Sequence, residues 1–541
     1  EAEPLYQGAI AILREDPKEH AIHLANSLNS LAYLYYSMGN YDAAEPLYRE
    51  ALAILQTVQE EQVQQLIAVC LNNLGLLYQA LSNYPTAESF LQRALTIRRE
   101  LLGEDHPLVA RSLSYLGVLY LAMEEFAQAE SSLRQALAIQ RKILGERHPE
   151  VANTLNSLAA LQRGQGNYAE AALLYQEAIT LGTATLGENH PTTASYINNL
   201  ARLYKAQGNY SEAEPLYQKA LTVRRQRLGE DHLDVAGSLY NLASLYVATG
   251  RSAEALALMH QGAAIHDRAI GQLFSIGSES QRMVYLAKLQ MYFDAFLSLI
   301  VNRLSSPPEP LRAGLDMVLR RKAIGVEALA AQRDAILGGR YPALEPKLRE
   351  LTALRAQIAQ KILAGPGPEG IAAHQKQLRE LNTQKDQLEI ELAHHVPEIT
   401  LAQQLRTADR QAVAHALPRE TALVEFVRFD TFDFDAITAR GERHWKEPFY
   451  VAFVLIAGDP DRVHLVNLGE AGPIDEQIAL FRATMIGEAE RHVAPASAQA
   501  PVVRSSQEAE RLYLALFAPL VPALHSCKQL FLAPDGDITR L

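Results

Sequence analysis

Small and apolar residues recur along the first half of the chain with a period close to 42 residues. An alanine at the start of an amphipathic stretch occurs at six positions, separated by 43, 42, 42, 42 and 42 residues: Ala44, Ala87, Ala129, Ala171, Ala213 and Ala255. In each unit, leucines, alanines and tyrosines lie three, four or seven residues apart, as they do over residues 28–51. This spacing places them on one side of a helix, so the pattern predicts two helices in every unit.

The residues between the two predicted helices are of the kind that ends a helix. Gly39-Asn40 and Gly208-Asn209 are examples, and both residue types adopt the left-handed conformation of a C-cap at little cost. The alanine that follows falls where the two helices cross, because a larger side chain would push them apart. Six units in register predict an α-solenoid. Since Ala44 minus 42 gives Ala2, we expect the chain to begin inside a seventh, cut unit.

This skeleton resembles the tetratricopeptide repeat, carried by Leu28-Asn29-Ser30-Leu31-Ala32 and its five counterparts. The period exceeds the usual length of about 34 residues. The additional residues contain a second motif, Leu-Gly-Glu-x-His-Pro, at 102–107, 144–149 and 186–191, and with Leu in place of Pro at 228–233. This form is similar to the long repeats of kinesin light chains. Its histidines lie a repeat apart, too far to share an ion, so we predict no metal site and interpret the motif as a loop between helices.

In the tetratricopeptide-repeat family, the residue after the first Leu of each first helix points into a concave groove. The resemblance places these residues there: Asn29, Asn72, Ser114, Asn156, Asn198 and Tyr240. The positions four and seven residues further add Tyr33, Tyr36, Arg163, Arg202 and Lys205. Asn offers donors and an acceptor to an extended peptide, and the cations suit an acidic one. The expected partner is a protein or an extended peptide in this groove. The alternative is that the amides only cap or solvate an exposed helix face.

Residues 264–400 keep a helical pattern but lose the 42-residue period. Pro307-Pro308-Glu309-Pro310 interrupts the pattern, and apolar stripes follow over 344–362 and 371–392, on either side of Gly365-Pro366-Gly367-Pro368. Two apolar helices joined by such a turn predict an antiparallel coiled-coil hairpin. We interpret the segment as a helical connector, with a hinge or a platform for a partner as the alternative.

From about residue 401 the pattern changes to runs of strand length. Such runs are Ala422–Phe429, Phe449–Ala457, Val463–Leu468 and Gln529–Ala533, and helical patterns cover Ile474–Arg491 and Ser506–Val521. Strands that alternate with helices predict an α/β layer.

This last segment resembles the CHAT domain, the caspase-like domain that accompanies tetratricopeptide repeats in bacteria. The resemblance is carried by residues 422–426, 450–455, 468–471 and 531–538, preceded by Ser280-Gln281-Arg282 and Leu319-Arg320-Arg321-Lys322. It implies a cysteine peptidase in which a thiolate attacks the scissile carbonyl and a His transfers the proton. In the family this His and Cys lie downstream of the Pro-Asp-Gly strand, and the present sequence ends at Leu541, five residues after Gly536. The resemblance therefore transfers no catalytic residue, and we expect the chain alone to be inactive.

Two cysteines, Cys70 and Cys527, exclude a disulfide framework and fit a reducing compartment, the cytoplasm. His525 and Cys527 are the only close Cys/His pair. We expect Cys527 to be a structural thiol beside a strand and Cys70 to pack inside a repeat. Asp535-Gly536 leaves two interpretations open, a turn that ends a strand or a cleavage site for an aspartate-specific protease.

Composition narrows the function further. A net charge of −12 over 541 residues argues against a general nucleic-acid binder. No apolar run reaches the length of about 18 residues that a membrane span needs, and no cofactor motif occurs. The expected fold is mainly α: a right-handed solenoid over 1–263, a helical connector over 264–400 and the first part of a CHAT-like α/β domain over 401–541.

The expected function is recruitment of a protein or peptide that regulates a caspase-like cysteine peptidase, whose catalytic half is not in this chain. One alternative is a non-enzymatic adaptor with a degenerate CHAT domain. A motor-cargo adaptor is a second alternative, against which the α/β segment argues.

Overall fold

The computed structural model describes residues 2–17, 19–37, 41–58, 63–81, 83–276, 279–337, 342–364, 374, 377–378, 380–382, 384–385, 388, 392, 409–491, 502–524 and 527–540. Two compact units make up the chain. The first comprises Glu1–Leu245, Ile276–Leu286 and Gln360–Glu391, and the second comprises Tyr246–Ser275, Ala287–Ala359 and Leu392–Leu541.

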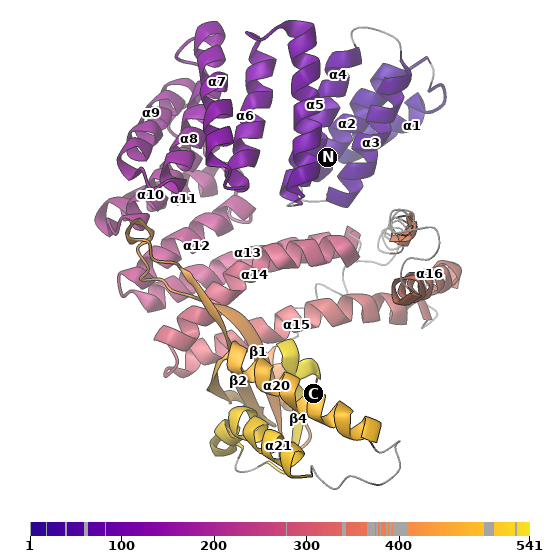
Figure 1. The fold of residues 1–541 in the computed structure, drawn as a ribbon, viewed down its shortest axis with the longest axis vertical. Coiled ribbons are helices and arrows are strands. Elements are labelled where there is room, and N and C mark those ends of the chain that lie inside the picture. Colours follow the sequence, from indigo (N-terminus) through magenta and orange to yellow (C-terminus); the bar gives the residue numbers. More distant parts are fainter. Residues whose placement is uncertain are drawn as a thin grey trace. The chain divides into compact units, whose positions relative to one another are not determined.

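Antiparallel helix pairs build the first unit (Figure 1, indigo to magenta). In chain order the helices are α1 (Ala2–Leu13), α2 (Ala21–Ser37), α3 (Tyr41–Thr57), α4 (Val63–Ala80), α5 (Tyr84–Leu102), α6 (Pro107–Ala122), α7 (Phe126–Leu144), α8 (Pro149–Gly164), α9 (Tyr168–Leu186), α10 (Pro191–Ala206), α11 (Tyr210–Leu228) and α12 (Leu233–Ala248). The sequence prediction of two helices per repeat is thus confirmed. The predicted turn at Gly39-Asn40 lies outside the described residues.

Close helix crossings explain the alanine period. None of the six alanines at 44, 87, 129, 171, 213 and 255 has exposed surface. Four residues after three of these alanines, the rings of Tyr48, Tyr175 and Tyr217 are also buried. In these three second helices a buried ring thus lies one turn after the small residue at the crossing, as the solenoid pattern predicts.

Enlarging one of these alanines is expected to destabilise the solenoid. Ala213→Leu inserts three carbon atoms where no surface is free, which should lower the free energy of unfolding by about 1–3 kcal/mol. Urea denaturation followed by circular dichroism measures the change. An unchanged transition would show that the crossing point has been assigned to the wrong residue, and Ser211→Leu on the exposed side of the same helix is the matched control.

The Leu-Gly-Glu-x-His-Pro segments are loops, as predicted. Gly103, Gly145, Gly187 and Gly229 end the second helices with φ between +79° and +98°, the region that favours glycine. Pro107, Pro149 and Pro191 occupy the first turn of the next helix. The His before each proline is the N-cap, a role that the sequence interpretation missed.

Long helices begin the second unit. These are α13 (Ser252–Ile276), α14 (Glu279–Arg303) and α15 (Pro308–Leu337), followed by α16 (Glu345–Ala364) and α19 (Arg410–Ala416). The predicted interruption at 307–310 falls at the start of α15, whose first residue is Pro308, and α14 ends before it at Arg303. In α16, Leu351 and Ile358 are buried, which fits the first helix of the predicted hairpin. The turn at 365–368 and most of the second predicted helix lie outside the described residues, so the hairpin stays a prediction.

A four-stranded mixed sheet occupies the end of the chain. Its strands are β1 (Thr421–Phe432), β2 (Trp445–Ile456), β3 (Asp459–Glu470) and β4 (Gln529–Ala533), in the order β3-β2-β1-β4. The first three pair antiparallel, and β4 pairs parallel to β1, with Thr421 opposite Gln529. A parallel pair needs a long crossover, which α20 (Ala471–Arg491) and α21 (Val502–Leu516) provide. All four predicted strands and both helices are confirmed.

Helices cover both faces of this sheet. On one face, Val424 and Phe426 of β1 pack in a cluster with Ile474 of α20 and Leu516 of α21. On the other face, Phe453 of β2 approaches Gly314 of α15, where an added Cβ would lie 3.1 Å from the phenyl ring. The sheet is therefore the middle layer of the second unit.

Candidate functional site

The first helices of the repeats present one row of exposed and half-buried side chains. Tyr33 is 55 % exposed, and Val118 and Arg202 occupy equivalent exposed positions on α6 and α10. We call this row the first-helix face. It comprises Tyr33, Leu76, Val118, Ala160, Arg202 and Ser244, flanked by Asn156, Arg163 and Lys205.

The predicted asparagines lie at the edge of this face, against the neighbouring first helix. Three amide pairs link consecutive first helices: Asn73 Nδ2 donates to Asn29 Oδ1 at 3.0 Å, Asn199 Nδ2 to Asn156 Oδ1 at 3.0 Å, and Asn241 Nδ2 to Asn198 Oδ1 at 3.2 Å. Asn29 and Asn156 stay half-buried, whereas Asn198 is buried, as is Tyr240. The amides therefore hold the repeats in register, a role that the prediction of a peptide-binding ladder did not include.

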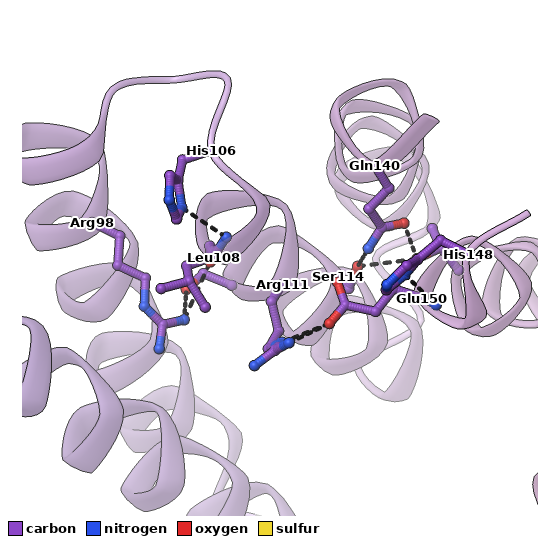
Figure 2. A network of polar contacts seen from close by, with 10 residues as sticks. Arg98, His106, Leu108, Arg111, Ser114, Gln140, His148 and Glu150 are labelled. Atoms are coloured by element: carbon purple, nitrogen blue, oxygen red, sulfur yellow. Dashed lines mark hydrogen bonds and ion pairs between the residues drawn. The ribbon is translucent and has the colours of Figure 1, made fainter. Parts of the chain in front are cut away.

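Asn72 belongs to a buried network around Arg98. Figure 2 shows Arg98 beside Leu108 in this network. Arg98 Nη1 donates to Ser112 Oγ at 2.7 Å and to the Leu108 carbonyl at 3.2 Å. With its carboxamide oxygen turned toward the guanidinium, Asn72 accepts from Arg98 Nη2 at 2.8 Å. Burial lowers the pKa of Arg98 to about 10, and no carboxylate among the described residues pairs with it. Asn72, 3 % exposed, is thus occupied inside the solenoid and does not face a peptide on the first-helix face.

The residues equivalent to Arg98 in the following repeats are Gln140, Gly182 and Arg224, at intervals of 42 residues. The size of each side chain is matched by the size of its partner 14 residues later. Arg224 donates to Ser238 Oγ at 2.6 Å, as Arg98 does to Ser112. Gln140 accepts from Thr154 Oγ1 at 2.8 Å. In the remaining repeat Gly182 faces Tyr196, whose ring would lie 2.9 Å from an added Cβ. A large residue on the second helix thus meets a small residue on the next first helix. Where the residue on the second helix is small, as at Gly182, its partner is large.

Three cations of the first-helix face lie close together. Burial raises the pKa of Tyr175 and of Tyr217, and the charges of Arg163 and Arg202 oppose both shifts, so both guanidinium groups lie near these two hydroxyls. Lys205 Nζ donates to Ser244 Oγ at 2.5 Å. Burial, and then the charge of Arg202, lowers the pKa of Lys205 to about 8. Among the residues that the structure describes, no carboxylate lies within 4 Å of Lys205 or Arg163.

The predicted tyrosines lie on α2, in the first complete repeat. The ring centroids of Tyr33 and Tyr36 are 6.3 Å apart, and those of Tyr36 and Tyr41 are 5.6 Å apart. Burial raises the pKa of Tyr36 to about 12, so its hydroxyl stays neutral. This aromatic cluster is separate in sequence from the three cations, which belong to the fourth and fifth repeats.

A buried ion pair joins α15 to the sheet in the second unit. Lys322 Nζ contacts the carboxylate of Glu425, which is 3 % exposed. The same ammonium donates to the carbonyls of Phe426 at 2.8 Å, Ala533 at 3.4 Å and Pro534 at 3.3 Å. It thereby links the middle of β1 to the end of the parallel strand β4.

Hydrogen bonds to β1 and β2 hold the turn that follows β4. Asp535 Oδ2 accepts from the Arg428 amide at 2.8 Å, and the Asp537 amide donates to Tyr450 Oη at 2.9 Å. Gly536 has φ +55°, and a Cβ there would collide with Tyr450 and Arg428. The engaged Asp535 carboxylate favours the turn over the cleavage site, the two interpretations that the sequence left open.

The two cysteines differ in their surroundings. Cys70 is buried, which raises its pKa to about 12. Cys527 packs against the core of the sheet, and His525, its predicted neighbour, lies outside the described residues. Within the described part of the chain, no His, Cys, Asp and Glu side chains gather into a group that could hold a metal ion. Nor does any helix there combine the length and apolarity needed to cross a membrane.

Comparison with known proteins assigns the repeats. Residues 1–57, 66–142, 115–184, 174–226 and 192–267 match the tetratricopeptide repeat. Taken together, the matched ranges cover residues 1–57 and 66–267, which include the helix pairs of the solenoid. Proteins with these repeats bind protein partners, so the coarse prediction of protein–protein interaction holds for this solenoid. The match does not extend to the four-stranded sheet.

Solved structures similar to the chain include other repeat proteins. BtubC (BKLC) from P. vanneervenii is 24 % identical, with 41 % of this chain and 88 % of that chain covered and a TM-score of 0.35. A putative kinesin light chain from Podosopora anserina with nearly identical TPR-like repeats is 28 % identical, with coverages of 37 % and 94 % and a TM-score of 0.31. The apo form of RapI is 19 % identical, with coverages of 49 % and 90 % and a TM-score of 0.40. No curated protein matches the chain.

Proposed function

We propose that the solenoid binds an acidic segment of a partner protein at Arg163, Arg202 and Lys205. The observation that carries the proposal is the convergence of exposed Arg202 with half-buried Arg163 and Lys205, with no carboxylate within 4 Å of Arg163 or Lys205 among the described residues. Arg202 and Lys205 lie three residues apart on α10, so their side chains are neighbours on the helix surface. One carboxylate of an extended peptide can therefore contact both, and charge-assisted hydrogen bonds are the stronger kind.

The half-buried amide of Asn156 supports the same proposal. Its oxygen is occupied by Asn199, which leaves its Nδ2 group to donate to a peptide carbonyl. Asn198 is occupied and buried, so we expect it to act by holding α10 and α12 in register. Asn156→Ala is thus expected to weaken binding directly, and Asn198→Ala only through the packing of the repeats.

Selection from a random peptide library with the full chain tests this proposal. The expected result is enrichment of peptides with two or more Asp or Glu residues. Binding of these acidic peptides should weaken as pH rises above about 8. An anion binds the protonated form of Lys205, whose pKa is about 8. Selected peptides without a charge preference would contradict the proposal.

We propose that the second unit forms the regulated part of a CHAT peptidase and that this peptidase acts in the cytoplasm. The order of a partner-binding solenoid, a connector and an α/β layer supports it, together with the motif residues over 422–426 and 531–538. Partner binding would then control a peptidase whose His and Cys are not among these residues. The alternative is an adaptor with a degenerate domain. A gene product that continues past Leu541 with a His and a Cys at strand ends would favour the peptidase.

The 541-residue chain is expected to hydrolyse no peptide. The thiol of Cys70 is buried, and nothing in the described residues supplies a base to Cys527. Incubation with a peptide library and with a thiol-reactive activity probe should give no turnover and no active-site labelling. Turnover that disappears in Cys527→Ala and persists in Cys70→Ala would contradict this expectation.

A further inference from the structure

Four histidines cap the first helices of successive repeats with the same atom. His106 Nδ1 accepts from the Leu108 amide at 3.1 Å, and the three equivalent bonds have similar lengths: His148 from Glu150 at 3.2 Å, His190 from Thr192 at 3.1 Å and His232 from Asp234 at 3.1 Å. Figure 2 shows two of these caps, His106 and His148. An imidazole nitrogen accepts a hydrogen bond only when it carries no proton. Each cap therefore requires a neutral ring with its proton on Nε2.

We propose that these four caps make the solenoid an acid-sensitive structure, whose repeat junctions loosen together when the histidines are protonated. Protonation of Nδ1 removes the acceptor and places a donor against the backbone N–H group. It also puts a positive charge at the positive end of the helix dipole. The usual N-caps Ser, Thr and Asn do not change charge between about pH 5 and 8. A His at four successive junctions therefore adds a property that the fold does not need.

The charged groups around the caps are mostly engaged with one another. On the loops and facing helices, the pairs are Arg99 with Glu104, Lys142 with Asp105, Arg141 with Glu146, Arg111 with Glu150, Lys219 with Glu188 and Arg225 with Glu230. Arg147 precedes His148, and Arg227 donates to the Asn189 carbonyl beside His190. Paired carboxylates offer little to a new imidazolium.

One junction differs from the others. The carboxylate of Asp234 lies 3.9 Å from His232 Nδ1, close enough to stabilise the charged ring. His232 is also the most exposed of the four histidines. We therefore expect the junctions at His106, His148 and His190 to respond to acid more strongly than the junction at His232.

Thermal unfolding of the full chain at pH 7.5 and 5.5 tests the proposal. The comparison is with the variant His106→Asn/His148→Asn/His190→Asn/His232→Asn, since Asn caps without titrating. Acidification should lower Tm of the parent by at least about 4 °C more than it lowers Tm of the variant. Equal falls in the two proteins would overturn the proposal.

Two further measurements keep the test decisive. His23→Asn, which changes a histidine in α2 that caps no helix, should keep the pH response of the parent. In the single variant His148→Asn, amide hydrogen exchange of residues 150–152 should lose its acid-induced drop in protection factor, whereas residues 108–110 should keep theirs. A drop that persists unchanged at 150–152 would overturn the proposal even if the fourfold variant fails to fold.

Discussion

Tyr196→Ser is expected to lower the free energy of unfolding by about 3–5 kcal/mol. The Tyr196 ring is buried beside Gly182, and its hydroxyl donates to Asn153 Oδ1 at 2.6 Å. Removing the ring leaves a cavity where no other side chain can enter, because residue 182 has none. The loss should appear as an earlier urea transition of the solenoid.

Gly182→Arg is expected to destabilise as well, since an added Cβ already meets the Tyr196 ring at 2.9 Å and Thr193 Oγ1 at 3.2 Å. Overpacking of this kind costs about 1–3 kcal/mol or more. Combined with Tyr196→Ser, however, the change recreates the pairs Arg98–Ser112 and Arg224–Ser238 of the neighbouring repeats. The double variant should therefore be more stable than the sum of the single changes by about 2 kcal/mol, within the usual range for residues in contact. Additive losses would show that the two positions do not compensate.

Lys322→Met is expected to lower the free energy of unfolding of the second unit by about 3 kcal/mol at pH 7.5. It leaves the buried carboxylate of Glu425 without its cation, and breaking a buried pair in this way is strongly destabilising. The double variant Lys322→Met/Glu425→Leu removes both charges and should recover most of the loss. A single variant as stable as the parent would contradict the role assigned to this ion pair.

The same variant should show a defined dependence on pH. Burial raises the pKa of Glu425, and the charge of Lys322 opposes the rise. Without Lys322 the folded protein favours the protonated carboxyl of Glu425 more strongly. The destabilisation by Glu425 is therefore smallest below the pKa of the unfolded chain, ordinarily near 4.3, and it grows as pH rises through the pKa of the folded protein. Unfolding curves at pH 5 and 7.5 should thus differ more for Lys322→Met than for the double variant.

The repeats could be predicted closely because their signals are local. Alanines at crossings, glycines at helix ends and prolines at helix starts each act within a few residues, and six copies reinforce one another. The direction of a single side chain was harder to predict. One residue along a helix turns its side chain by about 100°, which separates buried Asn198 from half-buried Asn199.

Long-range features could not be read from one sequence. The strands of the sheet follow from their apolar runs, but nothing local shows that β4 pairs parallel to β1, whose residues precede it by more than a hundred positions. Lys322 and Glu425 are similarly distant and meet only through the packing of α15. The pair Gly182 and Tyr196 is an intermediate case, because its signal becomes visible only when four repeats are aligned.

Binding of an acidic peptide to the fourth and fifth repeats is the central claim, and one titration tests it most directly. A peptide selected by the full chain is titrated calorimetrically into the parent, into Arg202→Glu/Lys205→Glu and into Arg93→Glu/Arg147→Glu. The last variant makes the same charge change at exposed residues away from the first-helix face. Reversal at Arg202 and Lys205 should weaken binding at least about tenfold, equivalent to about 1.4 kcal/mol, and the control should bind nearly as the parent does. Equal affinity of all three proteins would contradict the account and place the partner on another surface.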